Sequence, residues 1–364
     1  MARTRIGIIG CGNISSIYLE NLNRRFQTVE IAAVADLLPE RAQTQADKYG
    51  VARVISVAEM LADPGIEIIL NLTTPQSHHQ VCKQVLEAGK SVYVEKPLSI
   101  DLGDGQELLA LADSKGLLLG GAPDTFLGAG IQTCLDVIQS GRIGRPIGAT
   151  AFMTGHGHES WHPDPEFYYQ TGGGPMFDMG PYYLTALFAM LGPARRVTGS
   201  AAISFPQRTI TSAKKNGQLI DVEVPTHVAG VIDLQSGAIA TILTSFDVWS
   251  SELPRIEIYG SEGTLSVPDP NGFGGPVRLS QAGQTAFETV ELSRPYAENS
   301  RGLGVADLAR AWREGKRDHR ASGALALHVL EAMHGIHIAA ETGRHYEMKS
   351  GMTAPESLDP EFRY

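Results

Sequence analysis

The sequence is poor in cysteine and in long apolar segments, and both shortages exclude classes of protein. Its 364 residues include three cysteines, Cys11, Cys82 and Cys134, which form no C-x-x-C pair. Their odd number and wide spacing argue against a disulfide framework or a structural zinc site and favour a reducing compartment. The N-terminal stretch lacks a signal-peptide apolar region, and no apolar run approaches the ~20 residues that span a bilayer. We therefore expect a soluble cytoplasmic protein.

Positive charge is also scarce. Acidic residues number 40 and basic residues 30, so the formal net charge is −10. A chain of this sign is not expected to bind nucleic acid or an anionic membrane surface. Hydrophobic residues make up 43% of the chain and charged residues 19%, as in an ordinary globular enzyme. At roughly 150 residues per domain, the length predicts about two domains.

The pattern of apolar and polar residues changes near residue 124. Before that point, short apolar runs alternate with helical stretches, which predicts an α/β domain over residues 1–123 with a parallel, doubly wound sheet. After it, alternating segments with hairpin signals indicate antiparallel strands in a second, α+β domain over 124–364. Closing helices are expected at about 303–343 and can pack back on the first domain. The apolar runs are Arg5–Ile9, Ile31–Ala35, Arg53–Ile55, Glu67–Asn71, Ser91–Glu95 and Leu117–Gly121.

The first apolar run leads into a glycine pattern. Gly10 permits a tight turn, and Gly12 lets the backbone approach a pyrophosphate that the following helix can bind with its N-terminal amides. The third glycine of this dinucleotide-binding fingerprint is replaced by Ser15. Tight turns that bind nothing use the same residues. The contacts predicted for the cofactor here are Gly10, Gly12, Asn13 and Ile14.

Asp36 ends the second apolar run and completes this pattern. An acid about 20 residues after the glycines can bind the adenosine ribose hydroxyls. A helix cap before Pro39 also explains Asp36, and both roles are compatible. Its carboxylate would repel a 2′-phosphate, and no arginine follows at Leu37 or Leu38. We therefore expect NAD rather than NADP.

Two later apolar runs are followed by further candidate cofactor contacts, because ligands of open α/β sheets bind at the carboxyl ends of the strands. The first group is Thr73, Thr74 and Pro75. An ordinary turn explains this group equally well. In the second, Pro97 favours an extended backbone at Lys96, whose amine can hold a substrate hydroxyl and assist proton transfer if its pKa is lowered. The alternative is a solvated lysine beside Glu95. The cofactor contacts predicted at these ends are Thr73, Thr74, Pro75, His78, Glu95, Lys96 and Pro97.

These motifs resemble the glucose–fructose oxidoreductase/inositol dehydrogenase (Gfo/Idh/MocA) family of NAD(P)-dependent dehydrogenases. The glycine turn, Asn71–Pro75, Glu95–Pro97 and Gly172–Gly180 carry the resemblance, which extends over nearly the whole chain. It implies a Rossmann domain, then a domain with a large open sheet, and hydride transfer between nicotinamide and a carbinol carbon of a sugar or polyol. It also implies a homodimer or homotetramer formed through that sheet.

The second motif departs from the family pattern. Asp178, Tyr182 and Thr185 are spaced to share one face of a helix that starts near Met176. The family places its proton-transfer histidine where this chain has Tyr182. We therefore predict Lys96, Asp178 and Tyr182 as catalytic residues, with Asp178 orienting the substrate or Lys96. Alternatively Tyr182 only packs or binds the sugar, and Lys96 alone exchanges the proton.

A glycine-rich stretch with three histidines and a tryptophan, Gly155–Pro163, precedes this motif. A metal site is conceivable, but the family mechanism needs no metal, so none is predicted. Aromatic faces pack against sugar C–H surfaces, and histidine and tyrosine supply hydrogen bonds. A purely structural loop is the alternative. The residues predicted to bind substrate are Lys96, His156, His158, Trp161, His162, Tyr168, Asp178, Tyr182 and Trp249.

The sequence thus predicts an NAD-dependent dehydrogenase of a carbohydrate-like alcohol. Three alternatives stay open at this point. One is a redox-neutral enzyme that recycles its NAD within each turnover, for glycoside elimination, hydrolysis or epimerisation. Another is a ketoreductase of an activated sugar, which Tyr182 makes credible. The third is a non-catalytic NAD-binding sensor, which would have no need of Lys96 and Asp178.

Overall fold

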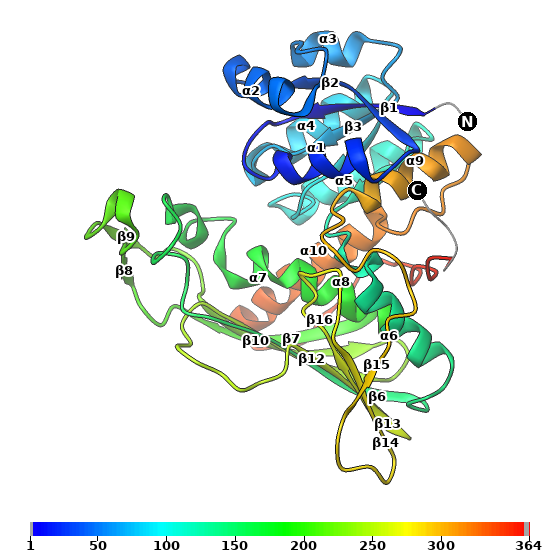
Figure 1. Ribbon diagram of the computed structural model, residues 1–364. Coiled ribbons are helices and arrows are strands. Elements are labelled where there is room, and N and C mark those ends of the chain that lie inside the picture. Colours follow the sequence, from blue (N-terminus) through cyan, green and yellow to red (C-terminus); the bar gives the residue numbers. More distant parts are fainter. Residues whose placement is uncertain (1–2, 360–363) are drawn as a thin grey trace. The chain divides into compact units, whose positions relative to one another are not determined.

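The computed structural model describes residues 3–359 and 364, and the chain divides into two compact units (Figure 1). The first unit comprises Met1–Leu127, Glu298–Leu330 and Pro355–Tyr364. The second comprises Gly128–Ala297 and Glu331–Ala354. Each unit is built around a sheet of its own.

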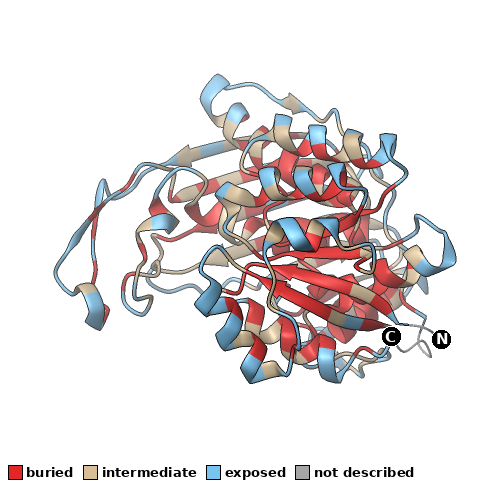
Figure 2. Cartoon of the chain, turned by 90° about the horizontal axis from the view of Figure 1, so that it is seen from above, coloured by how far each residue is buried: buried red, intermediate tan, exposed pale blue. Residues whose placement is uncertain are grey.

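The first unit holds a five-stranded parallel sheet in the order β2-β1-β3-β4-β5. Its strands are almost wholly buried, because helices lie on both faces, and Figure 2 shows them red between helices that are pale blue on their outer sides. This confirms the predicted α/β class. The strands are β1 (Thr4–Ile9), β2 (Val29–Ala35), β3 (Ile68–Asn71), β4 (Ser91–Val94) and β5 (Leu119–Gly121).

The helices of this unit follow the expected alternation with the strands. They are α1 (Ser15–Arg24), α2 (Pro39–Tyr49), α3 (Val57–Ala62), α4 (Pro75–Glu87), α5 (Leu102–Ser114) and α9 (Leu303–Glu314), with the one-turn 3-10 helix η1 (Thr125–Leu127). The first part of α10 (Gly323–Thr342) also belongs to this unit. Among the described residues, α10 is long and apolar enough to cross a membrane by length and composition alone. Within the structure, 67% of its most apolar window is buried, as in a core helix.

The prediction of a strand at Arg53–Ile55 is wrong. Only one parallel bridge forms there, between Val34 and Val54. The reason lies in the next residues, where Ser56 and Glu59 make a reciprocal capping box that starts α3 at once. The run is therefore too short to continue as a strand.

The second unit holds a nine-stranded sheet in the order β15-β14-β13-β12-β6-β11-β10-β7-β16. All neighbours are antiparallel except β6 and β11, which confirms an open, mostly antiparallel sheet. Its strands are β6 (Pro146–Thr154), β7 (Ala194–Ala202), β10 (His227–Leu234), β11 (Ile239–Ser245), β12 (Ile256–Gly260), β13 (Gly263–Val267), β14 (Val277–Gln281), β15 (Glu288–Val290) and β16 (Tyr346–Glu347).

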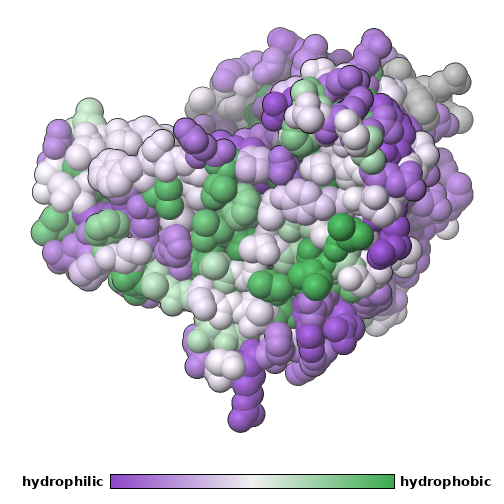
Figure 3. Space-filling model, turned by 90° about the horizontal axis from the view of Figure 1, so that it is seen from below, coloured by the Kyte–Doolittle hydropathy of each residue, from purple (hydrophilic) through white to green (hydrophobic). Residues whose placement is uncertain are grey.

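Helices cover one face of this sheet and leave the other open. The covering helices are α6 (Ala129–Gln139), α7 (Gly174–Asp178), α8 (Gly180–Leu191) and the later part of α10. On β10 and β11, the residues that face away from the buried row include Val231 and Ile239, which are 38% and 54% exposed. Seen from below, apolar side chains gather in green patches on the surface (Figure 3).

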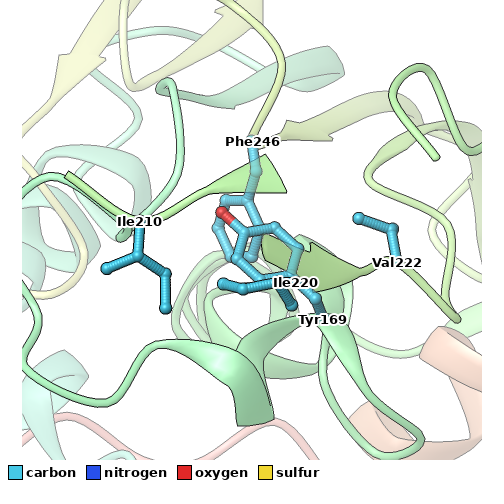
Figure 4. Packing of buried hydrophobic residues seen from close by; sticks show 5 residues of the cluster. All are labelled: Tyr169, Ile210, Ile220, Val222 and Phe246. Atoms are coloured by element: carbon cyan, nitrogen blue, oxygen red, sulfur yellow. The ribbon is translucent and has the colours of Figure 1, made fainter. Parts of the chain in front are cut away.

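A small hairpin lies outside the large sheet. Its strands β8 (Gln207–Thr209) and β9 (Leu219–Asp221) pair antiparallel around the 3-10 helix η3 (Ala213–Lys215). A buried cluster fastens this hairpin to the 3-10 helix η2 (Glu166–Tyr169) and to the end of β11. Figure 4 shows its members, Tyr169, Ile210, Ile220, Val222 and Phe246.

Candidate functional site

The carboxyl ends of the strands in the first unit form one continuous edge. The amide of Gly10 donates to the carbonyl of Ala35 at 2.9 Å, and that of Leu72 donates to Ile9 at 2.8 Å. The amide of Glu95 donates to Asn71 at 3.0 Å. The turns after β2, β1, β3 and β4 therefore lie side by side, where open α/β sheets bind their ligands.

The glycine turn in this edge fits a dinucleotide. Gly10 has φ = 100°, and a Cβ at this position would come within 2.6 Å of the Leu72 carbonyl group. A Cβ on Gly12 would have no atom within 4 Å. The N-terminus of α1 receives no side-chain cap, so no side chain of the turn competes for its amides. A phosphate could approach Gly12 and these amides, which is the geometry of the pyrophosphate site in such turns.

Asp36 joins this turn to the next one. Its Oδ2 accepts from the amide of Cys11 at 2.7 Å, and its Oδ1 accepts from the amide of Leu38 at 2.9 Å. Leu38 rather than Asp36 is the N-cap residue of α2. A carboxylate has about four acceptor positions, so Asp36 can serve both amides and still accept from ribose hydroxyls.

The turn after β3 is shaped by Asn71. The side-chain oxygen of Asn71 accepts from the amide of Thr73 at 3.1 Å and from its hydroxyl at 2.7 Å. The side chain of Asn71 is fully buried, whereas Thr74 is exposed and Thr73 and Pro75 are partly exposed. These residues border the glycine turn through Leu72, and their contact with the cofactor stays a prediction.

His78 supports the edge from beneath. It is fully buried, with Nδ1 2.7 Å from the carbonyl of Pro97 and Nε2 3.1 Å from that of Thr73. Burial lowers the pKa of this imidazole. Its contacts tie the turn after β3 to the turn after β4.

Lys96 lies on the same edge, two residues after the end of β4, and is partly exposed. The residue before it is buried, and the Glu95 carboxylate accepts from the hydroxyl of Tyr18 at 2.7 Å and from the Lys96 amide at 3.0 Å. Burial, with Glu95 nearby, raises the pKa of Tyr18 well above its usual value. Glu95 thus anchors the backbone of Lys96 to α1.

In the second unit, the prediction that Asp178, Tyr182 and Thr185 share one helix is wrong. Asp178 ends α7 and Tyr182 lies in the first turn of α8, with Met179 between the two helices. Pro181 explains the break, because it has no amide to donate to the carbonyl four residues earlier. Tyr182 is 8% exposed and Thr185 is 3% exposed.

The structure places His158 beside Asp178. The Nε2 atom of His158 lies 3.6 Å from Oδ2 of Asp178, and the two side chains are 13% and 16% exposed. The imidazole stacks on Tyr168 with ring centres 3.7 Å apart, and Phe246 meets it edge-on at 4.6 Å. The sequence predicts His158, Tyr168 and Asp178 as substrate contacts, but it does not indicate that His158 and Asp178 are neighbours.

The other predicted wall residues extend the aromatic surface. His156 stacks on Trp249, and His162 packs edge-on against Tyr168 with ring centres 5.4 Å apart. Trp161 and Trp249 are 62% and 81% exposed, which is unusual for side chains of this size. The second unit therefore presents several imidazole and indole faces, and one of these imidazoles, His158, lies beside Asp178.

A buried charge cluster that the sequence did not reveal holds this surface. Arg208 of β8 is 5% exposed, bonds Glu159 at 2.8 Å, and also pairs with Asp247. The hydroxyl of Tyr169 donates to Glu159, the residue after His158. No spacing links positions so far apart in the chain, so only the folded structure brings them together.

Comparison with known proteins assigns the family. Residues 4–121 match a family model described as an oxidoreductase family with an NAD-binding Rossmann fold, and residues 131–266 match the Gfo/Idh/MocA C-terminal domain. The chain is thus an oxidoreductase with an NAD-binding Rossmann domain. It belongs to the Gfo/Idh/MocA family, as its motifs indicate.

Relatives are similar over most of their length. The chain is 26% identical over 362 residues to the 1,5-anhydro-D-fructose reductase of Ensifer adhaerens, covering 96% of this chain and 99% of the relative. It is 25% identical over 263 residues to the myo-inositol 2-dehydrogenase of Thermotoga maritima, covering 72% and 74%.

Solved structures agree on the fold. Levoglucosan dehydrogenase in complex with NADH has a TM-score of 0.81 at 19% identity, with 96% of this chain and all of that chain covered. An aldose-aldose oxidoreductase from Caulobacter crescentus, complexed with glycerol, has a TM-score of 0.78 at 20% identity and covers 95% of this chain and 100% of that one.

Proposed function

We propose that this protein is an NAD-dependent dehydrogenase that transfers hydride between nicotinamide and a carbinol carbon of a sugar, a sugar derivative or an inositol-like polyol. The observation that carries this proposal is the position of Lys96 on the same strand-end edge as the glycine turn and Thr73. The names of the relatives support the substrate class, since each acts on a cyclic polyhydroxy compound or its ketone.

Each predicted site residue has a proposed role in cofactor binding, substrate binding or catalysis. The turn at Gly10 and Gly12 holds the pyrophosphate, and Asp36 binds the ribose hydroxyls, with Thr73, Thr74 and Pro75 lining the dinucleotide. When bound, NAD supplies the hydride acceptor or donor. Lys96 holds the reacting hydroxyl, and Asp178 orients the substrate or Lys96. His156, His158, Trp161, His162, Tyr168 and Trp249 form a wall for the sugar ring, with imidazoles that donate or accept hydrogen bonds.

Replacing Lys96 tests this function. We expect Lys96→Ala to abolish turnover of myo-inositol, levoglucosan or 1,5-anhydro-D-fructose, whichever the wild type converts, while NADH affinity falls less than about tenfold. The matched control is Lys83→Ala, which removes a lysine of α4 that pairs with Glu107 at the surface. Unchanged turnover in Lys96→Ala would overturn the mechanism.

The nucleotide content of the purified protein separates this function from its alternatives. An empty protein that binds NADH better than NADPH supports a dehydrogenase with exchangeable cofactor. Stoichiometric NAD that exchanges slowly would favour internal recycling instead. A protein that binds NADH but converts none of the three probes would favour the sensor.

We also propose a homodimer or homotetramer and a cytoplasmic location. The open face of the nine-stranded sheet, with exposed Val231 and Ile239, supports self-association. All three cysteines are buried free thiols, which suits a reducing compartment. Sedimentation of wild type against Val231→Lys tests the assembly, since a charge on this face should release monomers.

A further inference from the structure

We propose that His158, rather than Tyr182, exchanges the proton of the reacting hydroxyl, with Asp178 beside it to stabilise the protonated imidazole. This inference rests on the proposed dehydrogenase function. It assigns the proton transfer to a residue of the loop between β6 and η2, whereas the family motif would assign it to a residue of a helix.

The geometry selects one nitrogen of the ring. Nε2 of His158 lies 3.6 Å from Oδ2 of Asp178, while Nδ1 is buried. At 3.6 Å these two atoms are neighbours, at a separation longer than that of a usual hydrogen bond. Both side chains keep some exposure, 13% and 16%. A hydroxyl that lies against this pair can therefore meet Nε2 and the carboxylate together.

The ring is also held in place before any substrate binds. Tyr168 stacks on it at an interplanar angle of 7°, and Phe246 packs edge-on at 83°. The main-chain amide of His158 donates to the Tyr169 hydroxyl at 3.4 Å, and Tyr169 belongs to the buried cluster at the β8–β9 hairpin. Pre-orientation of this kind is what a proton-transfer group needs, because misplacement by 1 Å costs about 100-fold in rate.

The chemistry favours imidazole over phenol. An ordinary histidine has a pKa of about 6.5 and an ordinary tyrosine one of about 10, and a proton acceptor works best when its pKa lies near the working pH. A carboxylate next to the imidazole stabilises the charged form that results. The titratable or charged groups near the ring include Asp178 and Tyr168, with His162 packed against Tyr168. Glu159 and its partner Arg208 follow through the hydroxyl of Tyr169.

The proposed step balances. In the oxidative direction the O–H bond of the carbinol breaks and its proton passes to Nε2 of His158. The C–H bond breaks with its electron pair, the hydride passes to oxidised NAD, and a C=O bond forms. The reductive direction reverses both transfers, and His158 then returns the proton to the carbonyl oxygen.

Paired variants in the full-length protein test the assignment, with the probe among myo-inositol, levoglucosan and 1,5-anhydro-D-fructose that the wild type converts best. We expect His158→Gln to lower kcat by about 100-fold or more and to remove one ionisation from the pH profile of kcat/KM. Tyr182→Phe should lower kcat less than tenfold and keep that ionisation. NADH affinity, measured by fluorescence, should stay near the wild-type value in both.

Two additions protect the result from a folding artefact. His79→Gln on the surface of α4 is the matched control and should leave kcat and the profile unchanged. His158→Ala should regain turnover when free imidazole is added, which a structural loss would not allow. The inference is overturned if His158→Gln keeps kcat within threefold, or if Tyr182→Phe removes the ionisation while His158→Gln retains it. A wild type that converts none of the probes would instead overturn the dehydrogenase function itself, and this inference with it.

Discussion

Asp36 accepts a 2.7 Å hydrogen bond from the amide of Cys11, so the acid that follows β2 also holds the glycine turn that follows β1. The same carboxylate accepts from Leu38 with its other oxygen. Structural and recognition roles thus coincide at one residue. A change at Asp36 should disturb both the shape of the phosphate turn and the binding of the ribose.

We therefore expect Asp36→Ala to weaken NADH binding by tenfold or more, because hydrogen bonds to a charged acceptor contribute about 1.5–3 kcal/mol. The preference for NADH over NADPH should shrink as well, since the repulsion of a 2′-phosphate disappears. Asp36→Asn keeps a side-chain oxygen that can accept from the Cys11 amide. Its NADH affinity should therefore lie between those of the wild type and Asp36→Ala. Fluorescence titrations with both nucleotides measure this, and an unchanged NADH/NADPH ratio in Asp36→Ala would contradict it.

The two glycines of the turn predict opposite outcomes. Gly12→Ala should change the free energy of unfolding by less than about 1 kcal/mol, because its Cβ meets no atom within 4 Å. Its NADH affinity should nevertheless fall at least tenfold, as the methyl group occupies the phosphate approach. Gly10→Ala should cost about 2 kcal/mol or more in stability, because φ is +100° and the Cβ would press on Leu72.

Urea unfolding and NADH titration of both variants check this pair. The idea that Gly12 faces the pyrophosphate fails if Gly12→Ala binds NADH like the wild type. The account of Gly10 fails if its alanine variant is as stable as the wild type.

Local signals in the sequence were sufficient for most of the fold. Short apolar runs, a glycine turn and hairpin signals predict the two sheets, since each signal comes from residues close together in the chain. The errors arise where one local signal overrides another. The capping box at Ser56 ends the run at Arg53–Ile55, and Pro181 separates Asp178 from Tyr182.

Contacts between distant segments could not be predicted in this way. His158 and Asp178 come from a loop and from the end of a short helix, and no period connects them. Arg208 and Glu159 are 49 residues apart, and each resembles a surface charge in the sequence. Their partnership follows from the packing of the β8–β9 hairpin on η2, which depends on tertiary structure alone.

The Arg208 cluster predicts a large loss of stability. Arg208→Met leaves Glu159 and Asp247 buried without their shared cation, and breaking a buried pair in this way costs about 3–5 kcal/mol. Adding Glu159→Gln should recover part of that loss. Arg195→Met is the matched control, because Arg195 is 56% exposed and its ion pair should contribute less than about 1 kcal/mol. Chemical unfolding measures all three, and equal losses at Arg208 and Arg195 would contradict the cluster's role.

The same variant should affect turnover and cofactor binding differently. His158 precedes Glu159 directly, so Arg208→Met should impair turnover by displacing the loop. NADH affinity should persist, because the glycine turn and Asp36 lie in the other unit. A loss of NADH binding in a folded Arg208→Met protein would count against this division.

His337 on α10 gives the protein a predictable response to acid. Its ring stacks on Phe177 with centres 5.5 Å apart, and its Nε2 is buried without a hydrogen-bond partner among the described residues. Burial, with His334 nearby, lowers the pKa of His337 to about 4. The unfolded side chain titrates near its ordinary value of about 6.5. Between these two pKa values His337 is protonated in the unfolded chain but not in the folded chain. The free energy of unfolding therefore falls as the pH drops through this window.

We expect His337 to account for roughly 1–2 kcal/mol of the stability lost between pH 7.5 and pH 5. His337→Leu keeps an apolar contact with Phe177 and removes the titration, so it should lose that much less over the same interval. Burial also lowers the pKa of His78 and His319, and raises that of Asp124 to about 6, which has the opposite effect on stability in acid. These groups are common to both proteins and cancel in the difference. Urea unfolding of wild type and variant at both pH values measures it, and parallel pH dependences would show that His337 is protonated equally in the folded and unfolded states.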